Sequence, residues 1–434
     1  TAVDAIDGPV LVIAGPGTGK TQLLSMRVVK ILETTDTSPQ NILCLTFTNK
    51  AANNMRERLY ELIGPTAYKV SVHTFHSFAA DIMNKNPDFF WNGAQLSVVP
   101  DAIQLETIQD ILGSLPLDNP LARRFAGELT GLRATKEALK LTKEAGLTPE
   151  KLRAIITLNL AYIDIAEPIL IEHLSDSLSF KKLHSLAQSL EASLPEQSID
   201  EHMAPLLSLR TVILESLEYA IAQDEPTGKT TNTGKWKKRF IQTVAGQKLM
   251  DDERRRNNWW LALSDVYAKY RDALHERGYY DYADMLVEVI VQLEKNDILR
   301  ASVQEQYNYV LIDEFQDTNA AQLRLAHLVA DHYSSAGRPN LMVVGDDDQS
   351  IYKFNGAELN NMLSFRSFYG VEKPIVLSEN YRSSQDILDV AKLVAEQSTD
   401  RLVNREKDIT KNLIATRTAE KASVIEHIQY PTEQ

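Results

Sequence analysis

The sequence has little cysteine, no excess of basic residues and no long apolar run. Its one cysteine, Cys44 in 434 residues, excludes a disulfide framework within the chain, and its apolar neighbours predict a buried thiol. The formal net charge of −13 excludes a bulk polycation, so any nucleic acid must meet a local basic surface. Short apolar runs such as 10–14 are far from a membrane span, and the first residues lack a signal-type core. We expect a cytoplasmic protein without a membrane segment.

A glycine-rich segment near the start has the pattern of a phosphate-binding loop. The apolar run 10–14 predicts a strand, "AGPGTGKT" follows it, and a helix is expected over 20–33. The strict pattern begins with glycine, whereas this one begins with alanine. Glycines let successive N–H groups turn toward phosphate oxygens, beside the positive end of the helix dipole. The predicted nucleotide-binding residues are Ala14, Gly15, Pro16, Gly17, Thr18, Gly19, Lys20 and Thr21.

A second motif supplies carboxylates. In "YVLIDEFQDTN" an apolar strand over 310–312 delivers Asp313 and Glu314 at its carboxyl end, where ligands bind in open α/β sheets. Asp313 together with the Thr21 hydroxyl can hold Mg²⁺, and Glu314 can polarise an attacking water. The two motifs therefore predict one site for a nucleoside triphosphate and its metal ion.

The distance between these motifs in the sequence indicates an insertion. Lys20 and Asp313 are about 290 positions apart, more than a compact nucleotide-binding domain needs. Strands alternate with helices before residue 98 and again after 281, which predicts a parallel sheet with helices on both faces. Residues between about 100 and 280 show long helical periodicity. The fold class is therefore α/β, interrupted by a large all-α inserted domain.

The insert contains basic residues beside aromatic ones, in "GKWKKRF" (234–240) and "DDERRRNNWW" (251–260). Two interpretations stay open. The basic residues contact phosphates and Trp236 stacks on a base, or they form a solvated helix face with tryptophan in the core.

Seven segments, in this order, resemble the motifs of superfamily 1 helicases of the UvrD/Rep/PcrA type. They are "AGPGTGKT", "TFTNKAANNMRERL", "HTFHSF", "DYADML", "VLIDEFQDTN", "VVGDDDQSIYKFNGA" and "LSENYRSS". The resemblance implies two RecA-like cores that clamp one ATP with Mg²⁺. It further implies a motor that translocates 3′→5′ on single-stranded DNA, acts at duplex/single-strand junctions and unwinds duplex in DNA repair or recombination. The sequence does not identify a protein partner.

The resemblance also implies roles for individual residues. Glu314 is the catalytic base, Gln349 senses the γ-phosphate, Arg382 is an arginine finger, and Tyr381 stacks on adenine. Gln22 stands where the family has an arginine of the adenine clamp, so base discrimination is expected to be weaker. The positions of the family's DNA contacts are Phe47, Asn49, Thr74, His76, Tyr352 and Phe354.

The resemblance implies four segments. They are the first half of a RecA-like core (1–98), the inserted helical domain (99–280), the second half of that core (281–372) and the beginning of a second core (373–434). The late motifs of the second core are missing. We therefore expect a piece of a longer helicase, which binds ATP and Mg²⁺ but hydrolyses ATP poorly and does not unwind alone.

Two alternatives remain. The chain could be the helicase part of a RecB/AddA-like helicase–nuclease, which only sequence after residue 434 would decide. It could also be a nucleotide-gated module that binds nucleic acid or protein without unwinding. Poor ATP turnover in the complete gene product would favour the second.

Overall fold

The computed structural model describes residues 2–93, 96–174, 179–195, 208–244, 247–332, 335–349, 359–397, 401–406 and 408–416. The chain forms two compact units, which are described separately. Unit 1 comprises Thr1–Ala94, Glu144–Gly146 and Met285–Gln434, and unit 2 comprises Gln95–Lys143 and Leu147–Asp284. The chain thus leaves unit 1 and returns to it.

Unit 1 is built on a six-stranded sheet with the order β12-β1-β11-β10-β2-β3, in which every pair of neighbours is parallel. The strands are β1 (Val10–Ala14), β2 (Ile42–Thr46), β3 (Ser71–Thr74), β10 (Tyr309–Ile312), β11 (Leu341–Gly345) and β12 (Ile375–Leu377). Because all strands run the same way, their carboxyl ends share one edge of the sheet.

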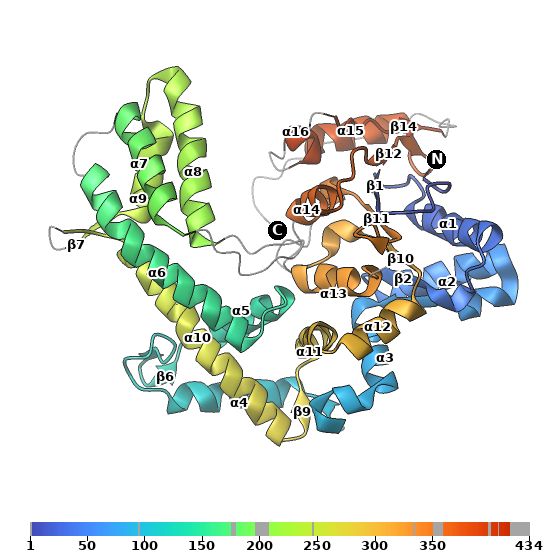
Figure 1. The fold of residues 1–434 in the computed structure, drawn as a ribbon, viewed down its shortest axis with the longest axis horizontal. Coiled ribbons are helices and arrows are strands. Elements are labelled where there is room, and N and C mark those ends of the chain that lie inside the picture. Colours follow the sequence, from blue (N-terminus) through green and yellow to red (C-terminus); the bar gives the residue numbers. More distant parts are fainter. Residues whose placement is uncertain are drawn as a thin grey trace, which may run out of the picture. The chain divides into compact units, whose positions relative to one another are not determined.

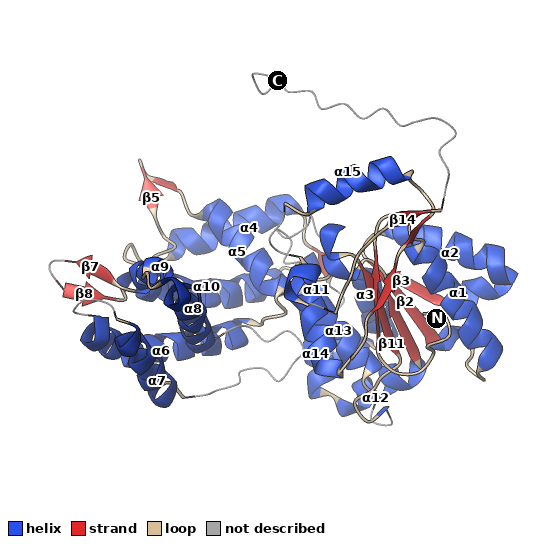
Figure 2. Ribbon diagram, turned by 90° about the horizontal axis from the view of Figure 1, so that it is seen from above, coloured by secondary structure: helices blue, strands red, loops and turns tan. Residues whose placement is uncertain are grey.

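Helices cover both faces of this sheet, and so the central strands are apolar at every position. All residues of β1, β2, β10 and β11 are buried. Figures 1 and 2 show α1 (Lys20–Thr34) and α2 (Asn49–Ile63) on one side, and α13 (Ala320–Ala330) and α14 (Leu359–Tyr369) on the other. The predicted α/β fold of RecA-like type is confirmed. Cys44 is buried, as predicted, and burial raises the pKa of its thiol to about 12.

The remaining elements of unit 1 lie around the sheet. They are α3 (Phe75–Lys85), α11 (Tyr282–Lys295), α12 (Asp297–Gln306), β13 (Glu379–Asn380), α15 (Gln385–Ala395), α16 (Leu402–Arg405) and β14 (Ile414–Ala415). The sequence predicts a new domain from residue 373. The structure pairs β12 with β1, so the first strand of that stretch completes the same sheet.

Unit 2 is mainly helical. Its helices are α4 (Asp101–Ser114), α5 (Leu132–Glu144), α6 (Pro149–Leu174), α7 (Phe180–Ser193), α8 (Leu209–Asp224), α9 (Thr231–Phe240) and α10 (Asp251–Glu276). Within its described residues there are also three short strand pairs. These are β4 (Ser97–Val98) with β9 (Tyr279–Tyr280), β5 (Arg124–Phe125) with β6 (Glu128–Leu129), and β7 (Gln242–Val244) with β8 (Gln247–Leu249). One core joins residues of α6, α7, α8 and α9.

Helix α6 is, among the described residues, the one helix long and apolar enough to cross a membrane by length and composition. It was not predicted from the sequence as a candidate membrane span. Its residues Tyr162, Ile163, Ala166 and Leu170 are fully buried in the core of unit 2. Of the most apolar 18-residue window of this helix, 28% is buried, and its buried residues pack within unit 2.

A buried lysine cage stabilises the packing of α5, α10 and the start of α11. Lys143 Nζ lies 2.8 Å from Asp281 Oδ2 and 3.0 Å from Asp284 Oδ2. The Tyr270 and Tyr267 rings flank the ammonium at 4.7 and 5.4 Å. Both hydroxyls donate to the same carboxylates. A lysine that is 1% exposed is tolerated here because each of its neighbours is polar or π-rich.

Candidate nucleotide site

The loop between β1 and α1 has the backbone of a phosphate cradle. Gly17 and Gly19 have φ of 75° and 87°, a region that side chains with a Cβ rarely adopt. The Thr18 hydroxyl donates to the Gly15 carbonyl at 2.8 Å and closes the turn. Gly19 is the N-cap of α1 and has no side chain to cap it, so the first N–H groups of the helix are open to a ligand.

The structure brings the two predicted motifs together. Lys20 Nζ lies 2.6 Å from Glu314 Oε2, and the Thr21 hydroxyl lies 3.4 Å from Asp313 Oδ2. Asp313 follows β10 directly, and its backbone N–H bonds to the Leu45 carbonyl of the neighbouring strand. Glu314 has φ of 48° and ψ of 47°, an uncommon left-handed conformation for a residue with a side chain.

Burial is the main cause of the raised pKa values of two carboxyl groups at this site, Asp313 and Asp317. Burial, and next the charge of Glu314, raise the pKa of Asp313 to about 6. The same two causes raise the pKa of Asp317 to about 6, and its Oδ1 is buried without a hydrogen-bond partner. Thr21 and Asp313 offer a hydroxyl and a carboxylate oxygen side by side. These hard oxygen donors fit Mg²⁺.

The segment after β13 closes the site from another side. Tyr381 N–H donates to the Gly17 carbonyl at 2.9 Å, and the Asn380 amide donates to the Pro16 carbonyl. Asn380 Oδ1 accepts from the N–H groups of Arg382 and Ser383 at 2.9 and 2.8 Å, which shapes the turn. The resulting pocket of about 480 Å³ is lined by Gly17, Gly19, Lys20, Thr21, Gln22, Asn54, Arg58, Glu314, Tyr381 and Arg382.

Comparison with known proteins identifies the family. Residues 1–370 match the model of the UvrD/REP helicase N-terminal domain. The chain belongs to the UvrD/REP helicase family. Similar curated proteins are the ATP-dependent DNA helicases PcrA of Bacillus subtilis strain 168 and of Staphylococcus aureus strain Mu50. Each is 27% identical over 92% of this chain. The chain spans only 39% and 40% of those two proteins. The resemblance inferred from the motifs is thereby confirmed.

Gln22 is predicted to stand in place of an arginine of the adenine clamp, and the structure shows what lies beside it. Arg58 of α2 donates from Nε to the Gln22 side-chain oxygen and also pairs with Glu61 at 2.6 Å. Arg58 lines the same pocket as Tyr381. The guanidinium of Arg58 therefore lines the same pocket as Tyr381, which is predicted to stack on adenine. Arg58 belongs to α2, whereas Gln22 belongs to α1.

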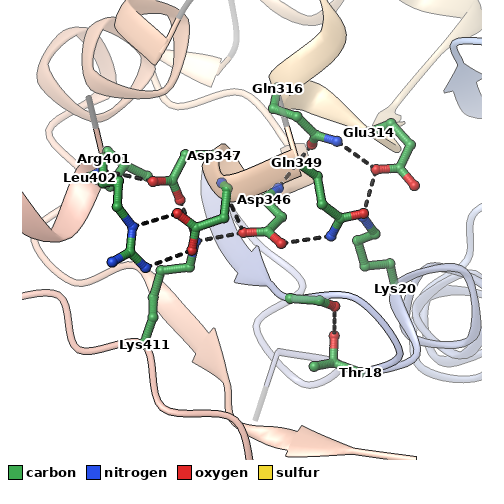
Figure 3. A network of polar contacts seen from close by, with 12 residues as sticks. Thr18, Lys20, Glu314, Gln316, Asp346, Asp347, Gln349, Arg401, Leu402 and Lys411 are labelled. Atoms are coloured by element: carbon green, nitrogen blue, oxygen red, sulfur yellow. Dashed lines mark hydrogen bonds and ion pairs between the residues drawn. The ribbon is translucent and has the colours of Figure 1, made fainter. Parts of the chain in front are cut away.

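Gln349 belongs to a 3-10 helix, η8 (Asp347–Gln349), that follows β11. Its amide donates to Asp346 Oδ2 at 2.6 Å. The three preceding aspartates are held by cations, since Lys411 contacts all three and Arg401 forms two bonds with Asp348 at 2.6 and 2.9 Å. Figure 3 shows this network beside Lys20 and Glu314. Burial raises the pKa of Asp348, but the bonds to Arg401 and the charge of Lys411 outweigh it and lower the pKa overall. Two cations thus offset two of the three carboxylate charges of this cluster.

Sequence reasoning missed Gln316 as a site residue. It lies in η6 (Phe315–Asp317) within "DEFQDTN", and its amide bonds both to Glu314 and to the Asp346 backbone. The one sequence signal for such a role was the position of Gln316 inside the motif "DEFQDTN", which follows the strand β10. Only the tertiary structure shows that its two amide atoms face different motifs.

Four of the six predicted DNA-contact positions are described, and they lie at the carboxyl ends of β2 and β3. These strands pair with Thr46 opposite Thr74, so their following residues are neighbours on one edge. Asn49 is exposed, Phe47 and His76 are half-buried, and burial lowers the pKa of His76 to about 4. Thr74 is buried and caps α3 through Ser77. Tyr352 and Phe354 lie outside the described residues.

Trp236 and the arginines of α10 favour the structural interpretation, whereas Lys235, Lys238 and Arg239 of α9 are exposed and phosphate contact by them stays a prediction. Trp236 is 5% exposed, packs against Phe240 and donates to the Ser216 hydroxyl at 2.9 Å, so it does not offer a free stacking face. Arg254 pairs with Asp164 and Glu167 at 2.6 and 3.1 Å. Arg255 and Arg256 pair with acidic residues one turn earlier on α10. The stacking hypothesis for Trp236 is wrong.

Proposed function

We propose that this protein is the ATP-binding part of a motor that translocates 3′→5′ on single-stranded DNA and unwinds duplex DNA in repair or recombination. The observation that carries the proposal is the convergence of Lys20, Thr21, Asp313 and Glu314 around one pocket that Tyr381 and Arg382 also line. These residues come from both sequence motifs and from the segment after β13. A lysine, a hydroxyl and two carboxylates around one pocket can bind a triphosphate group and orient a water molecule for attack on it.

The residues divide the chemistry among them. The loop N–H groups and Lys20 bind phosphate oxygens, and Glu314 accepts the proton of the attacking water. Lys20 is paired with Glu314 in the structure. A phosphate group that attracts Lys20 would release this carboxylate to act as a base. The pairing therefore links binding of the substrate to activation of Glu314.

Thr21 and Asp313 would hold Mg²⁺, which neutralises phosphate charge when bound. Tyr381 is 59% exposed, so its ring is accessible for stacking on adenine. Arg382 would stabilise the charge that develops as the γ-phosphoryl leaves, and Gln349 would sense that phosphate. These assignments rest on the motif order together with the positions of the side chains.

Single-stranded DNA and its junctions with duplex are the proposed partners. The edge formed by the ends of β2 and β3 carries Phe47, Asn49 and His76, and we propose that DNA crosses this edge. An aromatic face stacks on any base, which suits a motor without sequence preference. We further propose that the protein acts in the cytoplasm and that this chain by itself hydrolyses ATP poorly.

ATP hydrolysis with and without single-stranded DNA tests the proposal. The full-length gene product, this chain and the Glu314→Gln variant of each are compared. We expect strong stimulation by DNA in the full-length protein, weak turnover in the chain, and a loss of roughly 10²-fold or more in the variant, which keeps ATP binding. Equal turnover with and without DNA in the full-length protein would instead favour a nucleotide-gated binding module. Robust unwinding by the 434-residue chain would contradict the proposed impairment.

A further inference from the structure

Gln316 forms a direct bridge between two segments that follow different strands. Its Nε2 lies 2.7 Å from Glu314 Oε2, and its Oε1 lies 2.9 Å from the backbone N of Asp346. The side chain is 3% exposed. Figure 3 shows Gln316 between Asp346 and Glu314, with Lys20 on the other side of the same Glu314 carboxylate. The NH₂ group and the oxygen of the Gln316 amide thus each form a hydrogen bond.

The orientation of this amide follows from chemistry. A backbone N–H can only donate, so the atom of Gln316 that faces Asp346 must be the oxygen. The NH₂ group must then face Glu314, whose carboxylate can only accept when ionised. A reversed amide would leave the buried N–H of Asp346 without a partner and would place the amide oxygen against the Glu314 carboxylate. The bridge therefore has one stable arrangement.

The backbone of β11 leaves room for this bridge. A Cβ at Gly345 would lie 2.6 Å from Gln316 Oε1 and 2.5 Å from Met362 Cε, and so any side chain there would displace Gln316. The absence of a side chain at residue 345 lets η6 approach the end of β11 closely enough for the amide to reach the Asp346 N–H.

We propose that Gln316 is a positioning residue that holds the Glu314 carboxylate and couples it to the segment carrying Gln349. Asp346 accepts the Gln349 amide at 2.6 Å through its side chain, while its backbone donates to Gln316. A shift of this segment is therefore transmitted to Glu314 through one buried side chain. The inference rests on the proposed function, because it assigns Glu314 as the base.

Gln304 offers a matched control for a purely structural role. It is also a buried glutamine of unit 1, with 8% exposure, and its Nε2 donates to the carbonyls of Leu328 and Asp331 at 2.7 and 2.9 Å. None of these partners lines the nucleotide pocket. Gln304→Met and Gln316→Met each remove one buried and one partly buried hydrogen bond, but only the second variant loses a contact with Glu314.

The test measures kcat for DNA-stimulated ATP hydrolysis, ATP affinity and the thermal midpoint in the full-length gene product. We expect Gln316→Met to lower kcat roughly 10–100-fold, as loss of a group that orients a reactive one does, with ATP affinity changed less than about threefold. Gln304→Met should lower the thermal midpoint similarly and keep kcat within about twofold. If Gln316→Met does not fold, Gln316→Glu replaces it. That variant keeps an acceptor for the Asp346 N–H but sets an ionised carboxylate, in place of the donor, against Glu314.

A double-mutant cycle with Glu314→Gln decides whether Gln316 acts through Glu314. We expect the double variant to hydrolyse ATP as slowly as Glu314→Gln alone, because residues that act as a unit are not additive. Additive losses, or a normal kcat in Gln316→Met, would overturn the inference. Absence of DNA-stimulated hydrolysis in the unchanged protein would instead refute the proposed function, so the two failures are distinguishable.

Discussion

Lys20 Nζ lies 2.6 Å from Glu314 Oε2, although the two residues are 294 positions apart in the chain. The Lys20 side chain is 10% exposed and that of Glu314 is 33% exposed. An ammonium that is removed from water needs a partner, and this carboxylate is one. The same pair joins the start of α1 to the end of β10.

Replacing Lys20 with alanine should abolish tight nucleotide binding. The variant loses the cation of the cradle and also leaves Glu314 without its ion-pair partner. Isothermal titration with a non-hydrolysable ATP analogue and Mg²⁺ measures the affinity. Lys30→Ala, on the same helix α1 and outside the pocket, is the control and should bind normally. Unchanged affinity in the Lys20 variant would refute the phosphate assignment.

Gly17→Ala should weaken nucleotide binding, in addition to the loss of stability that its positive φ causes. Gly17 has φ of 75°, and a Cβ there would lie 2.7 Å from Arg382 Cβ and 2.8 Å from Asn380 Nδ2. Alanine would push the segment carrying Tyr381 away from the loop. Gly64→Ala is the matched control, since its φ is 59° and nothing lies within 4 Å of its Cβ position.

Both glycine variants should lose about 1–3 kcal/mol of stability, because residues with a Cβ rarely adopt the positive φ that both glycines have. Only Gly17→Ala should also lose affinity for the ATP analogue, by roughly tenfold or more, which is about 1.4 kcal/mol. Equal affinities in the two variants would show that the approach of residues 380–382 to the loop does not matter for binding.

Lys143→Met should destabilise unit 2 strongly. The substitution leaves two buried carboxylates, Asp281 and Asp284, without their cation. Breaking a buried ion pair on one side costs about 3–5 kcal/mol. The control is Lys136→Met, whose contact with Asp101 at 3.7 Å is solvent-exposed and should contribute less than about 1 kcal/mol. Urea unfolding measures both variants, and similar midpoints would contradict a stabilising role of the cage.

Asp317→Asn should stabilise the nucleotide-free chain at high pH. Burial and the charge of Glu314 raise the pKa of Asp317 to about 6 from 3.8, so the folded state holds its proton more tightly than the unfolded state. The resulting stability is fully present below pH 4 and is lost as the pH rises through 6. The ionised carboxylate therefore costs stability at pH 8, by about 1–3 kcal/mol.

Thermal melting of the two proteins between pH 4 and pH 8 checks this dependence. The asparagine variant should melt higher than the unchanged chain at pH 8, and the difference should disappear near pH 4. A constant difference across this range would show that folding does not raise the pKa of Asp317. Melting in the absence of nucleotide and Mg²⁺ keeps bound ligands out of the comparison.

The sequence by itself determined the sheet and the composition of the site. Continuous apolar runs such as Val10–Ala14 predict strands buried on both faces, and glycines at 17 and 19 predict the turn. Motif order then identified Lys20, Glu314 and Arg382 as members of one site. These features are local or follow from motif order, and so they can be read along the chain.

Only the tertiary structure decided which side chains face one another. That Arg58 lies beside Gln22, that Trp236 is in the core and that Gln316 joins Glu314 to Asp346 all depend on packing between segments far apart in sequence. The partners of a side chain are set by how the segments that carry them pack against each other. Neither propensity nor spacing contains that information, because it arises when distant segments pack together.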